Sequence, residues 1–151
     1  MTEQLETATA EKIRILPLVA AVVALVGLID AIYLTLHHYT GEKVPCSVTG
    51  GCETVLSSKF AEIGGVPLAL FGALAYFTVF SLATLTAFGD DRMWKFLSIV
   101  VALMAIFSLW LVYLQAFVIG AFCQFCLLSA GTTFTLLSLV IIKQLLPKRL
   151  S

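Results

Sequence analysis

Three long stretches of this chain are almost free of charge. Residues 15–36 contain one charged side chain, Asp30, while residues 66–88 and 96–142 contain none. The hydrocarbon core of a bilayer is about 30 Å thick and takes roughly 20 helical residues, whereas one helix over residues 96–142 would be about 70 Å long. The third stretch therefore has to turn back, and the pattern predicts four spans.

Gly120 is the best place for that turn, because glycine adopts turn dihedrals at little cost. It divides the third stretch into helices at 96–117 and 123–142. The predicted fold is thus an all-α membrane protein. It is a four-transmembrane-helix bundle with a large outer loop, residues 37–65, between the first two helices.

The count of spans also predicts the domain organisation and the orientation. A bundle domain is expected over 15–146, with tails at 1–14 and 147–151, and an even number of spans places both tails on one side. That side holds the basic residues Lys12, Arg14, Arg92, Lys95, Lys143, Lys148 and Arg149, and the other side holds Lys43 and Lys59. Since basic residues in short loops stay in the cytoplasm, we expect cytoplasmic termini.

Composition narrows the range of partners. The chain is 60% hydrophobic and 12% charged, against about a quarter charged in soluble domains, so membrane lipid is its expected surrounding. The formal net charge is zero, which gives no indication of nucleic-acid binding.

Four cysteines provide the candidate chemistry. Cys46 and Cys52 lie in the outer loop, and Cys123 and Cys126 form a C-x-x-C motif at the outer end of the fourth predicted helix. The predicted orientation puts all four at the outer face, in a compartment that permits disulfides. Thiols at i and i+3 are neighbours on a helix, and a helix N-terminus stabilises a thiolate. The two pairs together favour thiol–disulfide exchange.

Each pair also allows a plainer interpretation. Cys123 and Cys126 are compatible with a buried unreactive pair or a static disulfide, and Cys46 and Cys52 with a staple that closes the loop. The four together would make a zinc site, although the five residues between Cys46 and Cys52 exceed the usual spacing of zinc ligands.

The ordered set of motifs resembles the bacterial members of the vitamin K epoxide reductase family, over about residues 15–143. The shared segments are Tyr33-Leu-Thr-Leu-His-His, Cys46-x5-Cys52, Ser57-Ser58, Gly65-Val-Pro-Leu-Ala-Leu-Phe-Gly-Ala-Leu-Ala-Tyr76 and Cys123-Gln-Phe-Cys126. The resemblance implies a four-helix bundle around a quinone. It assigns Cys46 and Cys52 as the outer shuttle, Cys123 as the receiving thiol and Cys126 as the thiol nearest the quinone.

The function implied is that of an integral-membrane thiol–quinone oxidoreductase in the bacterial inner membrane, which generates disulfides. Electrons would pass from a periplasmic partner through the loop pair and the C-x-x-C pair to ubiquinone or menaquinone. Many bacterial members carry a fused thioredoxin-like domain, whereas this chain ends soon after its fourth predicted helix. The expected partner is therefore a separate thioredoxin-like, DsbA-type protein.

Several residues are candidates for the quinone pocket. Leu111 and Gln115 are spaced i, i+4 and so share one face of a helix, and the family serine falls on Ser58. A polar group at membrane depth needs a partner, which favours Gln115 and Ser58. The full candidate set is Leu56, Ser58, Phe60, Phe71, Tyr76, Leu111 and Gln115.

Three alternatives stay open. Vitamin K epoxide reductase proper is one alternative, although Ala130 and Leu68 stand where vertebrate members have tyrosine and asparagine, which favours a respiratory quinone as the substrate. A DsbB-type enzyme carries its C-x-x-C in the first outer segment, and the reversed order here argues against it. The third alternative is a non-catalytic four-span scaffold with structural disulfides.

Asp30 and two histidines complete the list of candidates. An ionisable residue inside a span is costly and suggests a function, and Asp30 is compatible either with a proton relay or with a protonated residue that packs the bundle. His37 and His38 lie at the outer membrane face. No third ligand is evident beside them, so we expect no metal.

Overall fold

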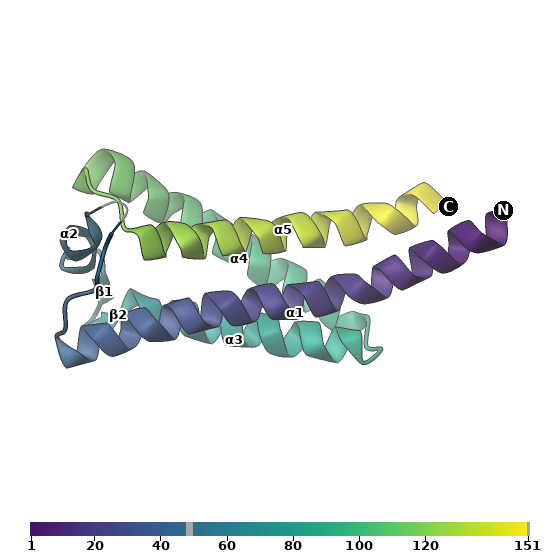
Figure 1. The fold of residues 1–151 in the computed structure, drawn as a ribbon, viewed down its shortest axis with the longest axis horizontal. Coiled ribbons are helices and arrows are strands. Elements are labelled where there is room, and N and C mark those ends of the chain that lie inside the picture. The colour runs from purple at the N-terminus through teal and green to yellow at the C-terminus, as the bar shows by residue number, and fades with distance from the viewer. Residues whose placement is uncertain (48–49, 151) are drawn as a thin grey trace.

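The computed structural model describes residues 1–47 and 50–150 of the chain. Its four long helices are α1 (Thr2–Thr40), α3 (Leu68–Ala87), α4 (Arg92–Tyr113) and α5 (Gln124–Leu150). Figure 1 shows both termini at one end of the bundle. The opposite end carries the short elements α2 (Cys52–Leu56), β1 (Glu62–Ile63) and β2 (Val66–Pro67), and a π-helix, η1 (Leu114–Ile119), which continues α4.

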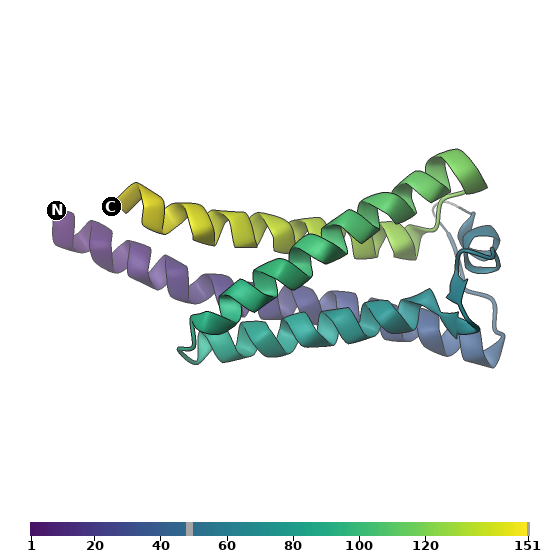
Figure 2. The same ribbon diagram turned by 180° about the vertical axis from the view of Figure 1, so that it is seen from behind.

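The four long helices pack as a closed ring. α1 contacts α3 and α5, and α4 contacts the same two helices from the other side, crossing them obliquely (Figure 2). Small residues allow the helices to approach closely, as is usual in membrane bundles. Those buried in the core include Ala20, Ala21, Ala24, Ala73 and Ala83.

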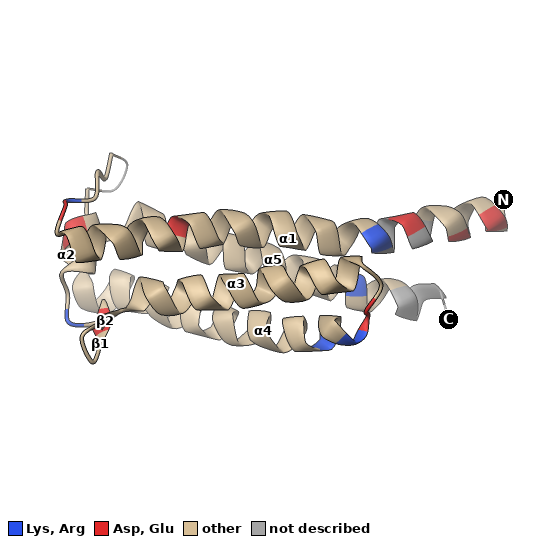
Figure 3. Ribbon diagram, turned by 90° about the horizontal axis from the view of Figure 1, so that it is seen from below, with Lys and Arg blue, Asp and Glu red and all other residues tan. Residues whose placement is uncertain are grey.

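All four helices are long and apolar enough to cross a membrane, over Arg14–Thr40, Leu68–Ala87, Arg92–Ile119 and Gln124–Leu146. Large apolar side chains such as Val22, Phe77 and Ile99 point outward and are more than half exposed, as lipid-facing residues are. Charged residues gather towards the two ends of the bundle (Figure 3). The predicted four-span membrane bundle is confirmed.

The helices extend beyond the apolar stretches that predicted them. α1 includes most of the segment expected as a tail at 1–14, and α5 continues through the expected tail to Leu150, while Ser151 lies outside the described residues. Hydropathy marks only the apolar part of a helix, whereas Ala, Glu, Lys and Arg favour helix on either side of it. α4 likewise begins at Arg92 rather than at residue 96.

The outer loop differs from the predicted range of 37–65 at both ends. α1 runs on to Thr40. Gly41 caps its end with a φ of 70°, a left-handed conformation that glycine adopts easily, and its N–H donates a 3.0 Å hydrogen bond to the carbonyl of His37. The loop then contains α2 and an antiparallel β1–β2 pair. The predicted turn at Gly120 is confirmed, with a φ of 71°.

Candidate functional site

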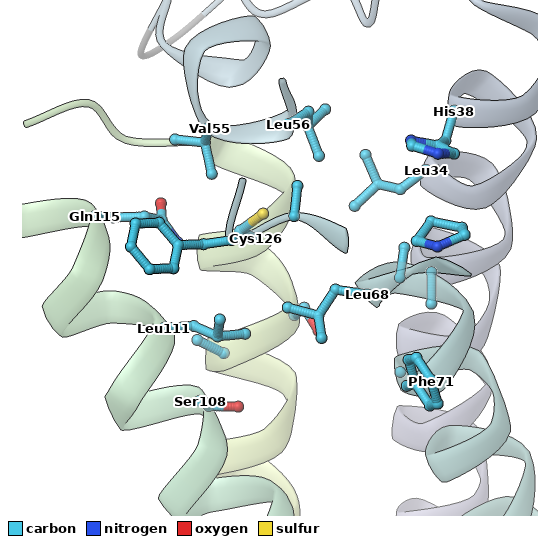
Figure 4. A pocket seen from close by; sticks show the side chains of 18 of the residues that line it. Leu34, His38, Val55, Leu56, Leu68, Phe71, Ser108, Leu111, Gln115 and Cys126 are labelled. Carbon is cyan, nitrogen blue, oxygen red and sulfur yellow. The ribbon is translucent and has the colours of Figure 1, made fainter. Parts of the chain in front are cut away.

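A cavity of about 1300 Å³ lies inside the bundle at the end that carries the loop. All four long helices and the loop contribute to its wall. Side chains of α1, α2, α3, α4 and α5 face this common space, with Cys126 pointing into it (Figure 4). The lining residues farthest from the loop on each long helix are Asp30, Tyr76, Leu103 and Thr133.

The C-x-x-C pair stands at the start of α5, and both of its thiols are free. Cys123 directly precedes the helix and is fully buried, whereas Cys126 lies in the first turn, is partly exposed and lines the cavity. The ring of Phe125, between the two, packs 5.3 Å from the ring of Tyr33 on α1. Cys126 is thus the cysteine of this pair that lines the cavity, whereas Cys123 is buried and does not line it.

Cys123 is arranged to become a thiolate. The thiol of Cys126 donates a hydrogen bond to its sulfur, and the backbone N–H groups of Cys126 and Phe125 add two more, which together lower the pKa of Cys123 to about 7 against the opposing effect of burial. The sulfur therefore caps the N-terminus of α5. Cys123 is a thiolate above about pH 7 and a thiol below it.

Gln115 holds the backbone of Cys123 in place. It lies in η1 and is buried, and its side-chain oxygen accepts a 3.0 Å hydrogen bond from the N–H of Cys123. The carbonyl of Gln115 accepts a second 3.0 Å bond, from the N–H of Gly120. Gln115 thus bonds to Gly120 at the start of the turn and to Cys123 at its end. It does so from a π-helix, a form often found at functional sites.

The loop pair forms a disulfide between Cys46 and Cys52. Cys52 is fully buried and belongs to one small apolar cluster with Val55 and Cys123, against which Cys46 and Cys126 also pack. The structure therefore brings the two cysteine pairs together, with the loop pair oxidised and the C-x-x-C pair reduced.

Gly51 allows the loop pair to lie against the turn before Cys123. A β-carbon at this position would stand 2.7 Å from the carbonyl oxygen of Phe122 and 2.9 Å from its nitrogen. Distances this short are not tolerated against backbone atoms. The absence of a side chain at Gly51 is therefore needed for this close packing.

All seven candidate pocket residues line the cavity: Leu56, Ser58, Phe60, Phe71, Tyr76, Leu111 and Gln115. Like Gln115, the other two polar ones also have partners within the protein. The hydroxyl of Ser58 donates to the carbonyl of Val55 at 2.6 Å, and the hydroxyl of Tyr76 donates to the carbonyl of Ser129 at 2.6 Å. Their role in binding a quinone stays a prediction.

Sequence reasoning missed Ser108, whose side chain faces the cavity from α4 (Figure 4). Leu103 and Phe107 line the same wall. The i, i+4 spacing that connects Leu111 to Gln115 also leads back to Phe107 and Leu103, and Ser108 precedes Leu111 by three. Following the face of Leu111 and Gln115 two turns towards the start of α4 would have predicted Leu103, Phe107 and Ser108 as well.

The other polar candidates occupy the wall and the mouth of the cavity. His38 Nε2 lies 3.1 Å from a carboxylate oxygen of Glu62 on β1, and His37 Nδ1 lies 2.9 Å from the carbonyl of Tyr33. Asp30 is buried at the inner end. Among the described residues, no group of three or more His, Cys, Asp or Glu side chains is placed to hold a metal ion.

Comparisons with known proteins point to one family. Residues 18–141 match the sequence model of the vitamin K epoxide reductase family. A curated relative is the thiol-disulfide oxidoreductase LTO1 of Arabidopsis thaliana, which is 30% identical over 118 residues. The match covers 72% of this chain and 31% of that protein, so this chain spans about a third of the relative's length.

Proposed function

This chain belongs to the vitamin K epoxide reductase family, and we propose that it is a membrane thiol–quinone oxidoreductase that generates disulfides. A dithiol protein outside the membrane is its electron donor, and a quinone dissolved in the bilayer is its acceptor. The observation that carries the proposal is the single apolar cluster in which the loop disulfide meets Cys123, next to a cavity lined by Cys126.

Burial suggests an order for the two loop cysteines. Cys46 is partly exposed, whereas Cys52 is fully buried beside Cys123. The donor's thiolate attacks Cys46, and its second thiol then releases the loop pair in the reduced form. Cys52 in turn attacks the Cys123–Cys126 disulfide at Cys123, freeing Cys126, and Cys46 resolves the resulting mixed disulfide. Each exchange moves one electron pair inward.

The cavity fits the last step. Cys123 and Cys126 form a disulfide again while two electrons reduce a quinone to the hydroquinone. An apolar cavity with a few polar groups suits an aromatic ring. Ser108 is a candidate hydrogen-bond donor to one of its carbonyls, and Ser58 is a second if its hydroxyl turns away from the carbonyl of Val55. The wall is apolar at Leu68 and Ala130, which favours a simple respiratory quinone, ubiquinone or menaquinone, over vitamin K epoxide.

The proposed orientation has the cysteines outside the cytoplasm. Arg14, Arg92 and Lys95 lie at the end of the bundle with the termini, and Lys43 and Lys59 at the cysteine end. The excess of basic residues marks the cytoplasmic side. A bacterial inner membrane with a separate, periplasmic DsbA-type donor fits this arrangement, because the periplasm supports disulfide formation.

A Gly51→Ala variant tests both the function and the contact that carries it. The wild-type protein should reduce a short-chain ubiquinone with either dithiothreitol or a reduced DsbA-type protein as donor. The added methyl group should push the loop away from Phe122 and lower the rate driven by the protein donor about 100-fold, the scale expected for a displacement of about 1 Å. The rate driven by dithiothreitol should stay near the wild-type value, since this small thiol reaches the C-x-x-C pair directly.

Gly131→Ala is the matched control, because a β-carbon at this position in α5 meets no atom within 4 Å. It should leave both rates unchanged. Quinone reduction that is absent from the wild-type protein with both donors would contradict the proposed function. An undiminished protein-driven rate in Gly51→Ala would contradict only the docking of the loop.

A further inference from the structure

Asp30 is a buried acid at the inner end of the cavity. Its side chain is 6% exposed, and about 15 Å of helix separates it from the end of α1 at Thr40. Within residues 1–47 and 50–150, its Oδ2 atom has no hydrogen-bond partner. A buried carboxyl oxygen without a partner is costly, so a group that meets it has to come from the cavity.

The surroundings of Asp30 favour its neutral, proton-carrying form. The titratable groups that interact with it are Tyr76 on α3, Cys126 on α5 and Cys123 before α5. None of these three supplies a positive charge. Over its described length, α4 contributes no charged side chain to the wall. An ionised carboxylate without a countercharge is strongly disfavoured at this depth.

The remaining charged or titratable residues of the wall lie towards the loop end of the cavity. They are His37, His38, Glu42, Lys43, Glu53 and Glu62. His37 stands two turns above Asp30 on the same face of α1. His37 therefore lies between Asp30 and the loop end of the cavity, the end from which a proton would return to Asp30.

Close packing and hydrogen bonds hold α1, α3 and α5 together at the inner end of the cavity, near Asp30. The ring of Tyr76 packs against Gly27, one turn below Asp30, so closely that a β-carbon on Gly27 would clash with the ring. The hydroxyl of Tyr76 lies within 2.9 Å of the hydroxyl oxygens of Ser129 and Thr133 on α5. α1, α3 and α5 are thereby joined at the level where Asp30 meets the cavity.

The proposed reaction needs one proton more than the thiol pair can supply. Reduction of a quinone to the hydroquinone takes two electrons and two protons. Above about pH 7 the reduced pair consists of the Cys123 thiolate and the Cys126 thiol, and so holds two electrons for the quinone but one proton. The second proton has to come from another group or from water.

We propose that the carboxyl group of Asp30 is the catalytic acid that delivers this second proton to the quinone. The step rests on the thiol–quinone function proposed above and balances with it. The Cys123–Cys126 bond forms, the S–H bond of Cys126 breaks, and two electrons pass to the quinone. One quinone oxygen takes the proton of Cys126 and the oxygen on the opposite side of the ring takes that of Asp30, which is then reprotonated from the outer side.

The test compares wild-type protein with an Asp30→Asn variant across pH, with dithiothreitol as donor and a short-chain ubiquinone as acceptor. At about pH 7.5 the variant should be about 100-fold slower, the scale of general acid catalysis. At about pH 6 the deficit should shrink to a few-fold, because the pair then carries both protons. A purely structural defect would give a deficit that does not change with pH. Asp30→Glu should restore most of the rate, and Glu11→Gln, an exposed acid on the same helix, should change nothing.

A second measurement covers the case in which Asp30→Asn does not fold, as judged by size-exclusion chromatography. Infrared difference spectra of turning-over wild-type protein with isotope-labelled aspartate should show a protonated carboxyl band that is lost and recovered with quinone reduction. Its absence, or a pH-independent deficit in a folded variant, would overturn the role of Asp30 while wild-type quinone reduction still stands. A wild-type protein that reduces no quinone would overturn the function and the proton donor together.

Discussion

A Cys126→Ser variant is expected to reduce quinone no faster than the uncatalysed background, even when dithiothreitol supplies the electrons. Cys126 is the cysteine whose side chain lines the cavity, so neither the loop pair nor a small thiol can bypass it. The loss should exceed about 1,000-fold, as is usual when the reacting nucleophile of an enzyme is removed. The measurement is the absorbance change of a short-chain ubiquinone with protein in detergent.

Serine at this position retains a hydrogen-bond donor for Cys123, so the fold and the start of α5 should persist. Thermal unfolding of the variant should therefore resemble that of the wild type. Residual turnover within about ten-fold of wild type would show that electrons reach quinone by a route that avoids Cys126. The electron path proposed for the cavity would then be wrong.

The second large effect is expected from Cys46→Ser. Turnover driven by a reduced DsbA-type protein should fall to background, because the donor loses the partly exposed sulfur that it attacks. Turnover driven by dithiothreitol should persist, because this thiol can reduce the Cys123–Cys126 disulfide itself. Without Cys46, no loop thiol remains to resolve a disulfide between Cys52 and Cys123. That mixed disulfide should accumulate when dithiothreitol is withdrawn, and peptide mass spectrometry after alkylation detects it.

The two serine variants serve as controls for each other. Cys126→Ser should lose both rates, whereas Cys46→Ser should lose one. Equal rates of the two variants with the protein donor, both well above background, would contradict a relay in series. An absence of the Cys52–Cys123 disulfide, together with a different trapped pair, would reassign the order of the loop cysteines.

Much of the architecture could be predicted from the sequence because the bilayer fixes it. Charge-free stretches of sufficient length have to span, and a stretch twice too long has to turn at Gly120. The ends of the helices could not be predicted in this way. The polar flanks of α1 and α5 favour helix through local propensity, which hydropathy does not detect.

The sequence predicted which residues form the candidate site better than it predicted the contacts between them. The motif order identified the four cysteines and the wall residues, but the partner of Gln115 depends on a π-helix that no sequence pattern indicated. The closeness of Gly51 to Phe122 is likewise a contact between segments far apart in the chain. For Asp30, a relay or a packing residue by sequence, the contacts of the carboxyl could not be predicted either, and its Oδ2 atom has no hydrogen-bond partner among the described residues.

The central claim is that electrons pass from the loop pair to the C-x-x-C pair and then to quinone. The most direct measurement adds one equivalent of a short-chain ubiquinone to fully reduced protein, quenches with acid at intervals, alkylates free thiols and maps disulfides by mass spectrometry. The account predicts that the Cys123–Cys126 disulfide appears first. The Cys46–Cys52 disulfide should then replace it, leaving the redox state seen in the structure. Four cysteines that stay reduced, or a Cys46–Cys52 disulfide that forms before any Cys123–Cys126 disulfide, would contradict it.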